Sequence, residues 1–263
     1  MYMNGKILFT VILCFLLIGK SYSQNQFDSV RYFGIEVGNT FLSFNIPDYS
    51  FIRADNSSNN NDNSAINLTG RYNEFQFSIK TETRSLKNKL GLLYGIRLTY
   101  IASSLGKQDI WSKNDKYFYL LVNQSNNSSE ILRINEISQN SYFIGIPLEL
   151  RYFTSHNRFF RFYFKTSVDL SYKFFTKNDV IFYNDNMESY TADVINKFAK
   201  PSPFHCNINF GAGIKLGKES KFNINIEAFA VSFNIVKTNS SIVKTSIGGG
   251  VQVNLLIPLK FKL

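Results

Sequence analysis

The sequence has few of the residues from which most catalytic and metal sites are built. It holds two histidines and two cysteines in 263 residues. Cys14 lies in the apolar N-terminal stretch, which leaves Cys206 alone and excludes an intrachain disulfide from the rest of the chain. There is no phosphate-binding glycine loop, no metal-ligand cluster and no carboxylate pair at a meaningful spacing. We therefore expect no metal, no cofactor and no enzymatic activity.

Long hydrophobic runs are missing after the N-terminus, and the mean hydropathy is -0.13. A membrane-spanning helix needs about 20 consecutive apolar residues, so a helical membrane protein is excluded. A membrane barrel is not excluded, because the alternation of its strands averages their hydropathy away. Aromatic residues make up 16% of the chain, which favours β-structure.

The N-terminus has the pattern of a cleavable signal peptide. Lys6 supplies a positive charge, 7–18 is an apolar core, and 21–23 ends in small residues. A membrane anchor is the alternative, but the apolar run is short for a span. We expect residues 1–23 to be removed and residues 24–263 to form one exported domain.

The stretch from Ser141 to Lys173 carries the clearest pattern in the chain. Apolar and polar side chains alternate over 141–154, stop at the polar run 155–158, and alternate again over 159–173. Because the side chains of a strand point alternately to two sides, this predicts two strands joined by a short turn. Each half exceeds the about ten residues that cross a bilayer as a tilted strand. One face is apolar and the other carries acids and bases, which is typical of a transmembrane β-barrel.

The same alternation predicts an all-β, eight-stranded, antiparallel up-and-down transmembrane barrel. Its connections are alternately long and short, as expected for long external loops and short periplasmic turns. A slip of parity in the seventh strand indicates a bulge near Ala228. Two short periodic segments, 116–122 and 130–137, are expected to form a hairpin above the membrane; a ten-stranded barrel is the alternative. The expected strands are 31–42, 72–83, 90–103, 141–154, 159–173, 204–216, 222–236 and one that starts near 243.

Charged residues and glycines gather on the inward parity of these strands. An eight-stranded barrel is only wide enough inside for side chains, and buried charges are tolerated when they are paired. We therefore expect a lumen closed by salt bridges, with glycines leaving room for long charged neighbours. An ion path or an acid–base site is the alternative. The expected network is Glu36, Lys80, Arg97, Glu149, Arg151, Arg161, Lys165, Asp169, Lys215 and Glu227, and Glu74, Glu82 and Lys173 share its parity.

The long connections contain aromatic residues among Asn and Ser, a composition that suits a binding surface. Anchoring at the membrane interface explains several of them equally well. The candidates for an interaction through the loops are Tyr117, Tyr119, Tyr183 and Tyr190.

His205 is the one candidate for chemistry. It begins the sixth strand near the outer rim, where Ser202, Asp193 or Asp179 could join it in a hydrolytic site. Nothing in their spacing requires this, so we expect a structural histidine. The formal net charge of +10 could suggest nucleic acid, but the basic residues are scattered and the chain is exported, so we expect no nucleic-acid partner.

The motif YFIGIPLELRYF at 142–153, followed by a short polar turn and an aromatic-rich strand, resembles the bacterial outer-membrane β-barrel family called PorT-like. The stretches IEAFAVSFNIV at 226–236 and TSIGGGVQV at 245–253 resemble that family's last two strands. The resemblance covers the whole mature chain and implies an eight-stranded barrel in the outer membrane of a Gram-negative cell. One branch of the family assists a protein-secretion and gliding apparatus. The chain departs from many outer-membrane proteins by ending on Leu263, so Phe261 would have to serve as the terminal aromatic.

We therefore expect a structural or interaction protein of the outer membrane. It would contact membrane lipid through its barrel and a protein partner through its external loops or periplasmic turns, with a role as an accessory to secretion implied by the resemblance. A barrel enzyme that hydrolyses lipid or peptide near His205, or a narrow channel, is the alternative.

Overall fold

The computed structural model describes residues 29–54, 64–85, 89–106, 117–123, 129–154 and 159–259. In these ranges the chain is mostly antiparallel β-structure, with short helical segments η1 (Ala65–Asn67), η2 (Asp185–Tyr190) and α2 (Thr191–Asn196). No helix in the described ranges is long and apolar enough to cross a membrane. The expected signal peptide, the Asn-rich run 56–63, the turn 155–158 and Phe261 lie outside the described residues.

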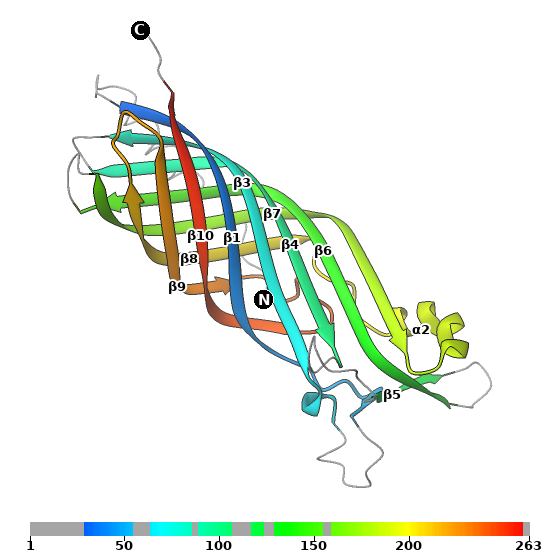
Figure 1. Cartoon of the computed structure of the whole chain (residues 1–263). Coiled ribbons are helices and arrows are strands. Elements are labelled where there is room, and N and C mark those ends of the chain that lie inside the picture. Colours follow the sequence, from blue (N-terminus) through cyan, green and yellow to red (C-terminus); the bar gives the residue numbers. More distant parts are fainter. Residues whose placement is uncertain are drawn as a thin grey trace, which may run out of the picture.

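Ten strands form one sheet, and eight of them close into a ring (Figure 1). Around the ring the order is β6-β4-β3-β1-β10-β9-β8-β7, and β7 pairs back with β6. The antiparallel all-β prediction is confirmed, and the ring has the eight strands and the up-and-down order that the sequence predicted, whereas the ten-stranded alternative is wrong, because β5 and β2 pair outside the ring. The strands are β1 (Ser29–Asn45), β2 (Ile52–Arg53), β3 (Gly70–Ser85), β4 (Leu90–Leu105), β5 (Phe118–Asn123), β6 (Ser129–Phe153), β7 (Phe160–Phe182), β8 (Phe204–Leu216), β9 (Asn223–Asn234) and β10 (Lys244–Leu259).

Strands β6 and β7 are longer than the sequence predicted. The expected short strand 130–137 is the first part of β6, which continues through a bulge between Ile134 and Glu136. Strand β7 runs on to Phe182, where a loop was expected from residue 174. We call β2, β5, residues 129–136 of β6 and residues 174–182 of β7 the sheet extension. The predicted hairpin of 116–122 and 130–137 is present as the pairing of β5 with the start of β6, whereas β2 and the end of β7 lack the apolar alternation on which the prediction depended.

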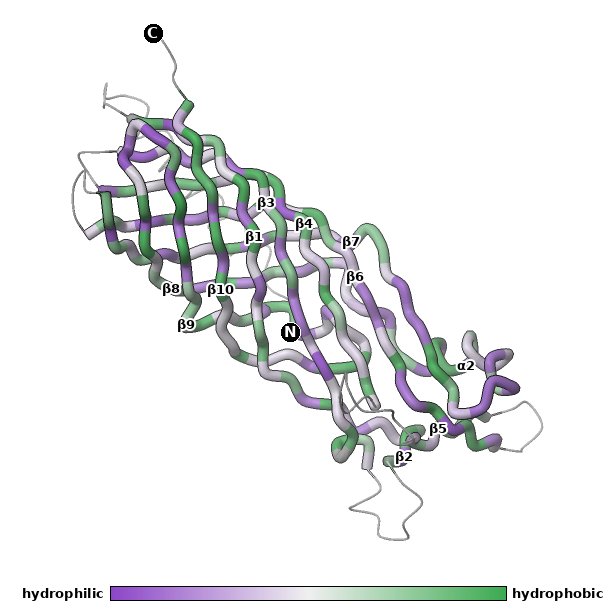
Figure 2. Tube along the Cα trace, in the orientation of Figure 1, coloured by the Kyte–Doolittle hydropathy of each residue, from purple (hydrophilic) through white to green (hydrophobic). Residues whose placement is uncertain are grey.

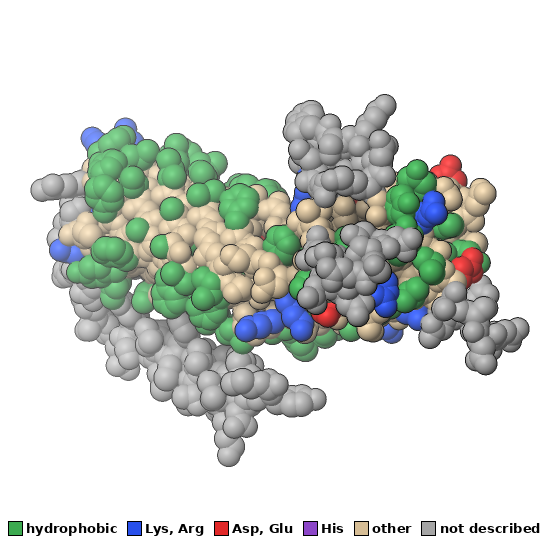
Figure 3. All heavy atoms as spheres, turned by 90° about the horizontal axis from the view of Figure 1, so that it is seen from below, with side chains coloured by type: hydrophobic (Ala, Val, Ile, Leu, Met, Phe, Trp, Pro, Cys, Tyr) green, Lys and Arg blue, Asp and Glu red, His purple; other side chains and the backbone are tan. Residues whose placement is uncertain are grey.

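The outer surface of the ring is apolar on every strand. Ile79 of β3 is 46% exposed and pairs with Ile35 of β1 on one side and Ile96 of β4 on the other. Registers of this kind carry an apolar band from strand to strand, and Figure 2 shows the alternation along each strand. In Figure 3 hydrophobic side chains cover much of the left part of the visible face, while the acidic side chains in view lie in the right part, toward α2.

The parity slip in β9 comes from one extra residue, as predicted, although it falls slightly later than Ala228. Phe229 pairs with Gly211 and Val231 with Phe210, so Ala230 has no counterpart on β8. Phe229 keeps the inward parity of Glu227 and is 6% exposed, and the bulge turns Val231 to the outer surface. After the bulge Ser232 faces the lumen, as the polar residues Asn225 and Glu227 do before it.

The inner side of the sheet extension is a hydrophobic core, which the sequence did not predict. Leu132 and Ile134 of β6 pack there with Phe118 of β5 and Val194 of α2. Figure 1 shows α2 beside the far ends of β6 and β7. The interior of the molecule therefore changes from polar within the ring to apolar under the extension.

Candidate functional site

Three carboxylates meet in the middle of the lumen. Oxygens of Glu36, Glu149 and Glu227 come from β1, β6 and β9 and lie within 4.8 Å of one another. Lys80 contacts the first two of them, and Lys165 lies 3.0 Å from Glu149 and 2.7 Å from Glu227. The ammonium groups of Lys80 and Lys165 therefore balance the charge of these carboxylates, as a bound metal ion would otherwise do. The site is a cluster of paired charges.

Arginines extend this cluster along and across the lumen. Arg97 lies 2.6 Å from Glu36 and 2.5 Å from Asp169. Arg151 lies 2.5 Å from Glu227 and continues to Glu82 at 3.0 Å. The structure thus brings together eight of the ten predicted network residues, and each of the ten is between 0 and 3% exposed: Glu36, Lys80, Arg97, Glu149, Arg151, Arg161, Lys165, Asp169, Lys215 and Glu227.

The two remaining predicted residues, Arg161 and Lys215, belong to a second cluster at the end of the ring that holds the short turns. It centres on Glu219 in the turn between β8 and β9, which accepts from Arg161 at 2.6 Å and Lys215 at 2.6 Å. Arg84 at 2.7 Å and the Tyr32 hydroxyl at 2.6 Å complete the cluster. Burial acts to raise the pKa of Glu219, but Arg84 and the hydrogen bonds from Lys215 and Tyr32 lower it to about 2. A residue of the turn therefore folds back and closes this end of the lumen.

The opposite end is covered by the segment 235–243 between β9 and β10, which was expected to be a short external loop. Asn239 is fully buried and Ile242 is 2% exposed. Two hydrogen bonds hold the segment: the hydroxyls of Ser103 and Ser240 lie 2.7 Å apart, and the Gln139 side-chain amide donates to the Ser241 hydroxyl at 2.7 Å. A cavity of about 180 Å³ remains between this cap, α2 and the outer ends of β6 and β7.

Tyr49 ties the cap to the segment that follows β1. Its hydroxyl donates to the Ser241 carbonyl at 2.5 Å and to the Ile242 carbonyl at 3.1 Å. Burial raises the pKa of Tyr49 to about 12, which keeps this donor protonated at neutral pH. The cap is therefore joined to β4, β6 and the segment after β1, so it is part of the folded body.

His205 lies inside the lumen just beneath the cap and is 1% exposed. Its Nε2 is 3.3 Å from Glu74, its Nδ1 is 2.6 Å from the Asn239 amide, and its ring packs against Phe143. Ser202 is one of the residues that the sequence offered as a catalytic partner of His205. Its hydroxyl is instead hydrogen-bonded to the backbone of Phe204. The structure therefore gives His205 a polar, enclosed position in the wall of the lumen.

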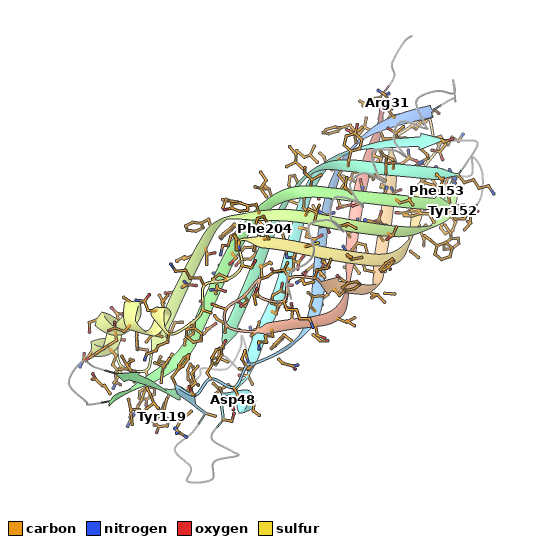
Figure 4. The ribbon with its side chains drawn as sticks, turned by 180° about the vertical axis from the view of Figure 1, so that it is seen from behind. Arg31, Asp48, Tyr119, Tyr152, Phe153 and Phe204 are labelled. Carbon is orange, nitrogen blue, oxygen red and sulfur yellow. The ribbon has the colours of Figure 1, made fainter. Side chains whose placement is uncertain are left out.

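Three of the four candidate tyrosines meet on the outward face of the sheet extension. The Tyr117 ring lies 5.4 Å from that of Tyr119 and 4.6 Å from that of Tyr183. The Arg133 guanidinium lies 5.1 Å from the centre of the Tyr117 ring. Figure 4 places Tyr119 at the opposite end of the molecule from Tyr152 and Phe153. Tyr190 lies apart from this group and packs against the hydrophobic core.

Sequence reasoning missed two members of the lumen clusters and misplaced one. Arg84 has the inward parity of Lys80 and Glu82, but the strand was expected to end at residue 83. Glu219 falls in the short turn between the expected strands 204–216 and 222–236, and nothing in its sequence neighbourhood signals that it folds inward. Lys173 shares the inward parity but donates to the Pro201 carbonyl at 2.7 Å rather than joining the network.

The inward glycines serve close packing more than they leave room for charges. A Cβ atom on Gly145 would lie 2.2 Å from the Leu170 carbonyl oxygen, so only glycine lets β6 and β7 approach there. At Gly213 a Cβ atom would meet the Tyr163 ring at 2.5 Å. A Cβ atom there would also lie 2.9 Å from Cγ of Glu227, so Gly213 leaves room for a charged neighbour, as expected, and for an aromatic ring as well.

Comparison with known proteins adds little. No family model matches the chain, and no curated protein matches it, so the PorT-like resemblance has only the sequence patterns behind it. Among solved structures, the chain is similar to the transport unit of the autotransporter AIDA-I from Escherichia coli, with 11% identity over 91% of this chain and 92% of that one. The TM-score is 0.28, which is too low to carry an argument about fold or function.

Proposed function

We propose that this chain is an integral protein of the outer membrane that crosses it as an eight-stranded barrel. The observation that carries the proposal is the apolar band on the outside of a closed ring whose inside is charged. A soluble protein rarely exposes a contiguous apolar patch of more than a few hundred Å². A surface that is apolar on all eight strands therefore fits lipid better than water.

Aromatic side chains border the band, as the aromatic girdles of outer-membrane barrels do. At one edge the Tyr142 ring packs 5.1 Å from that of Tyr100 and 5.7 Å from that of Phe175. Tyr152 marks the other edge on the same strand. Ten residues separate Tyr142 from Tyr152, about 33 Å along the strand and about 25 Å in height at a tilt of about 40°. That is the height of the apolar band expected for this class.

The barrel itself serves as a rigid, closed support in this proposal. Charged clusters fill the lumen and are shielded from solvent, and covers lie at both ends, so transport through it is not the function we propose. The sheet extension stands beyond the apolar band and is the part available to a partner. The PorT-like resemblance suggests that this partner belongs to a protein-secretion apparatus.

The proposal includes no enzymatic activity, no metal and no cofactor. If His205 were a general base, the variant His205→Ala would lose a hydrolysis that the purified protein performs on lipid or peptide. We expect neither form to hydrolyse vesicles of phosphatidylethanolamine or a casein substrate. A hydrolysis that disappears in the variant would favour the barrel enzyme instead.

Fractionation of cells and gel mobility test the proposal together. The mature protein should be recovered with outer membranes, resist extraction by carbonate, and migrate differently on gels with and without boiling, because folded barrels withstand the detergent. Recovery as a soluble periplasmic protein would overturn the proposal. Membrane recovery without a mobility shift would call for a second folding probe, such as protease resistance in detergent.

A further inference from the structure

Four strands of the sheet extension line up alternating arginines and tyrosines. Arg53 of β2 pairs with Tyr119 of β5, and Tyr119 pairs with Arg133 of β6. Tyr183, directly after β7, donates its backbone N–H to the Arg133 carbonyl at 3.0 Å. We call Arg53, Tyr119, Arg133 and Tyr183 the Arg–Tyr row.

The four side chains share the outward face of the extension. Their neighbours Ile52, Phe118, Leu132, Ile134 and Phe182 point inward and are at most 7% exposed. Because side chains alternate along a strand, the row must face away from that core. The core holds the four strands in place, so the row is fixed before any partner arrives.

The arginines of the row have no acidic partner within the described part of the chain. The Arg133 guanidinium lies over the Tyr117 ring, and Arg53 and Arg133 are both exposed residues. In the lumen, by contrast, Arg97 and Arg151 each contact more than one carboxylate. A guanidinium fork matches a carboxylate with two parallel hydrogen bonds, so the row presents unused sites for negative charge.

Apolar side chains flank the row on the same face. Ile131 of β6 is 55% exposed and Ile181 of β7 is 48% exposed. Tyrosine and arginine are enriched at protein interfaces and dominate their binding energy. Arginine, tyrosine and isoleucine side by side therefore resemble a protein-binding surface.

Its height decides between a lipid headgroup and a protein. Arg133 lies nine residues beyond Tyr142 on β6, which is about 30 Å along the strand and about 20 Å in height at the tilt of such barrels. The headgroup layer adds only about 5–8 Å to each side of the hydrocarbon core. The row therefore stands above the headgroups, where a protein can reach it.

We infer that the Arg–Tyr row binds an acidic segment of a partner protein. Carboxylates of the segment pair with Arg53 and Arg133, and its apolar side chains pack on Tyr119, Tyr183 and the flanking isoleucines. This inference rests on the proposed function, because it takes the extension to stand outside the membrane.

The test is a selection of phage-displayed random twelve-residue peptides on the full-length mature protein, refolded in detergent micelles. We expect enrichment of peptides that carry two or more acidic residues beside aliphatic or aromatic ones. A selected peptide, made synthetically, should bind Arg133→Glu at least about 30-fold more weakly, as loss of an interface hot spot does. Added salt should weaken its binding to the wild type.

The matched control is Lys177→Glu, the same charge reversal on the same face of β7. Residue 177 lies six positions from Tyr183, about 20 Å along the strand, and is exposed. We expect it to leave peptide affinity within about twofold of the wild type. Equal losses in Lys177→Glu and Arg133→Glu would reduce the effect to overall charge and overturn the inference.

Three other outcomes also decide the matter. Selection of peptides without acidic residues would overturn the inference, as would a selection that enriches nothing. Binding of dextran sulfate or of phosphatidylglycerol vesicles, weakened by Arg133→Glu in the absence of any selected peptide, would assign the row to a glycan or to lipid instead. Each preparation is first checked for the gel-mobility shift of a folded barrel, so a failed inference is distinguished from a failed proposed function.

Discussion

Glu219 shows how a single turn residue can hold several strands together. Its carboxylate joins Arg84 of β3, Arg161 of β7 and Lys215 of β8. Removing its charge leaves Arg161 and Lys215 without a carboxylate partner among the described residues, while Arg84 keeps Glu82. We expect Glu219→Gln to lower the free energy of unfolding by about 1–3 kcal/mol at pH 7, the usual cost of stranding charged hydrogen-bonding groups. Chemical unfolding in detergent measures it, with the exposed Glu188→Gln as control.

The lowered pKa of Glu219 also predicts how its contribution to the free energy of unfolding changes with pH. A carboxyl whose pKa is about 2 when folded and about 4.3 when unfolded stabilises the fold fully above the higher value. That contribution falls as pH drops from about 4.3 toward 2. The stability difference between the wild type and Glu219→Gln should therefore shrink over this window. A difference that stays constant from pH 7 to pH 3 would show that the pKa of Glu219 is the same in the folded and the unfolded state, so that the cluster does not lower it.

Arg97 tests the lumen network at its centre. It contacts Glu36, Glu149 and Asp169, all buried. Truncation breaks the buried ion pair of Asp169 and removes one cation from Glu36 and Glu149, which keep Lys80, and breaking a buried pair costs about 3–5 kcal/mol. We expect a loss of that size for Arg97→Ala, and a comparable one for Glu149→Ala, in guanidinium unfolding in detergent. Leu148→Ile, on the opposite parity of β6, should change little. A loss under about 1 kcal/mol, as for exposed pairs, would mean that water fills the lumen.

At the scale of an element, the bulge in β9 keeps the whole strand in phase. Ala230 is the extra residue, and the bulge that accommodates it lets both Phe229 and Ser232 face inward. Deleting it would leave a regular strand in which Phe229 and Ser232 still face inward and Val231 still faces outward, because Ala230 is the residue without a counterpart. We expect a deletion of Ala230 to refold in detergent with a yield close to that of the wild type, measured from the gel-mobility shift.

The contrasting variant is a deletion of Ile226, which lies in the regular part of β9. It should lower the refolding yield at least several-fold, because one residue of slip exchanges the two faces of a strand. Equal yields from the two deletions would show that β9 can shift its register, and the bulge would then have no role in folding.

At the scale of the whole molecule, the ring is filled along its axis. The turn with Glu219 closes one end, salt bridges occupy the middle, and the segment 235–243 covers the other end. Folded protein in planar lipid bilayers should therefore give no steady single-channel current at neutral pH. Sustained currents that change size in Arg97→Ala would assign the lumen to an ion path and replace the closed-barrel proposal with the narrow channel.

The sequence by itself determined the ring. Apolar and polar residues alternate with a period of two along each strand, and this pattern is visible in the sequence. It therefore predicted which side chains face the lumen and which face outward. Glu36, Arg97 and Glu149 could be assigned to one interior without knowing their partners, because parity alone puts them there. The bulge was visible for the same reason, since an extra residue breaks that period within the strand.

Only the tertiary structure decided what lies at the two ends and beyond them. Glu219, Asn239 and Arg133 carry no local signal, because their roles depend on residues far away in the chain: Arg84, His205 and Tyr119. The sequence predicted the hairpin of β5 and the start of β6, but not β2, the end of β7 or the core beneath them, because that core is assembled from segments far apart in the chain. Parity follows from the chain's own geometry, whereas the caps and the Arg–Tyr row exist only once the strands have paired.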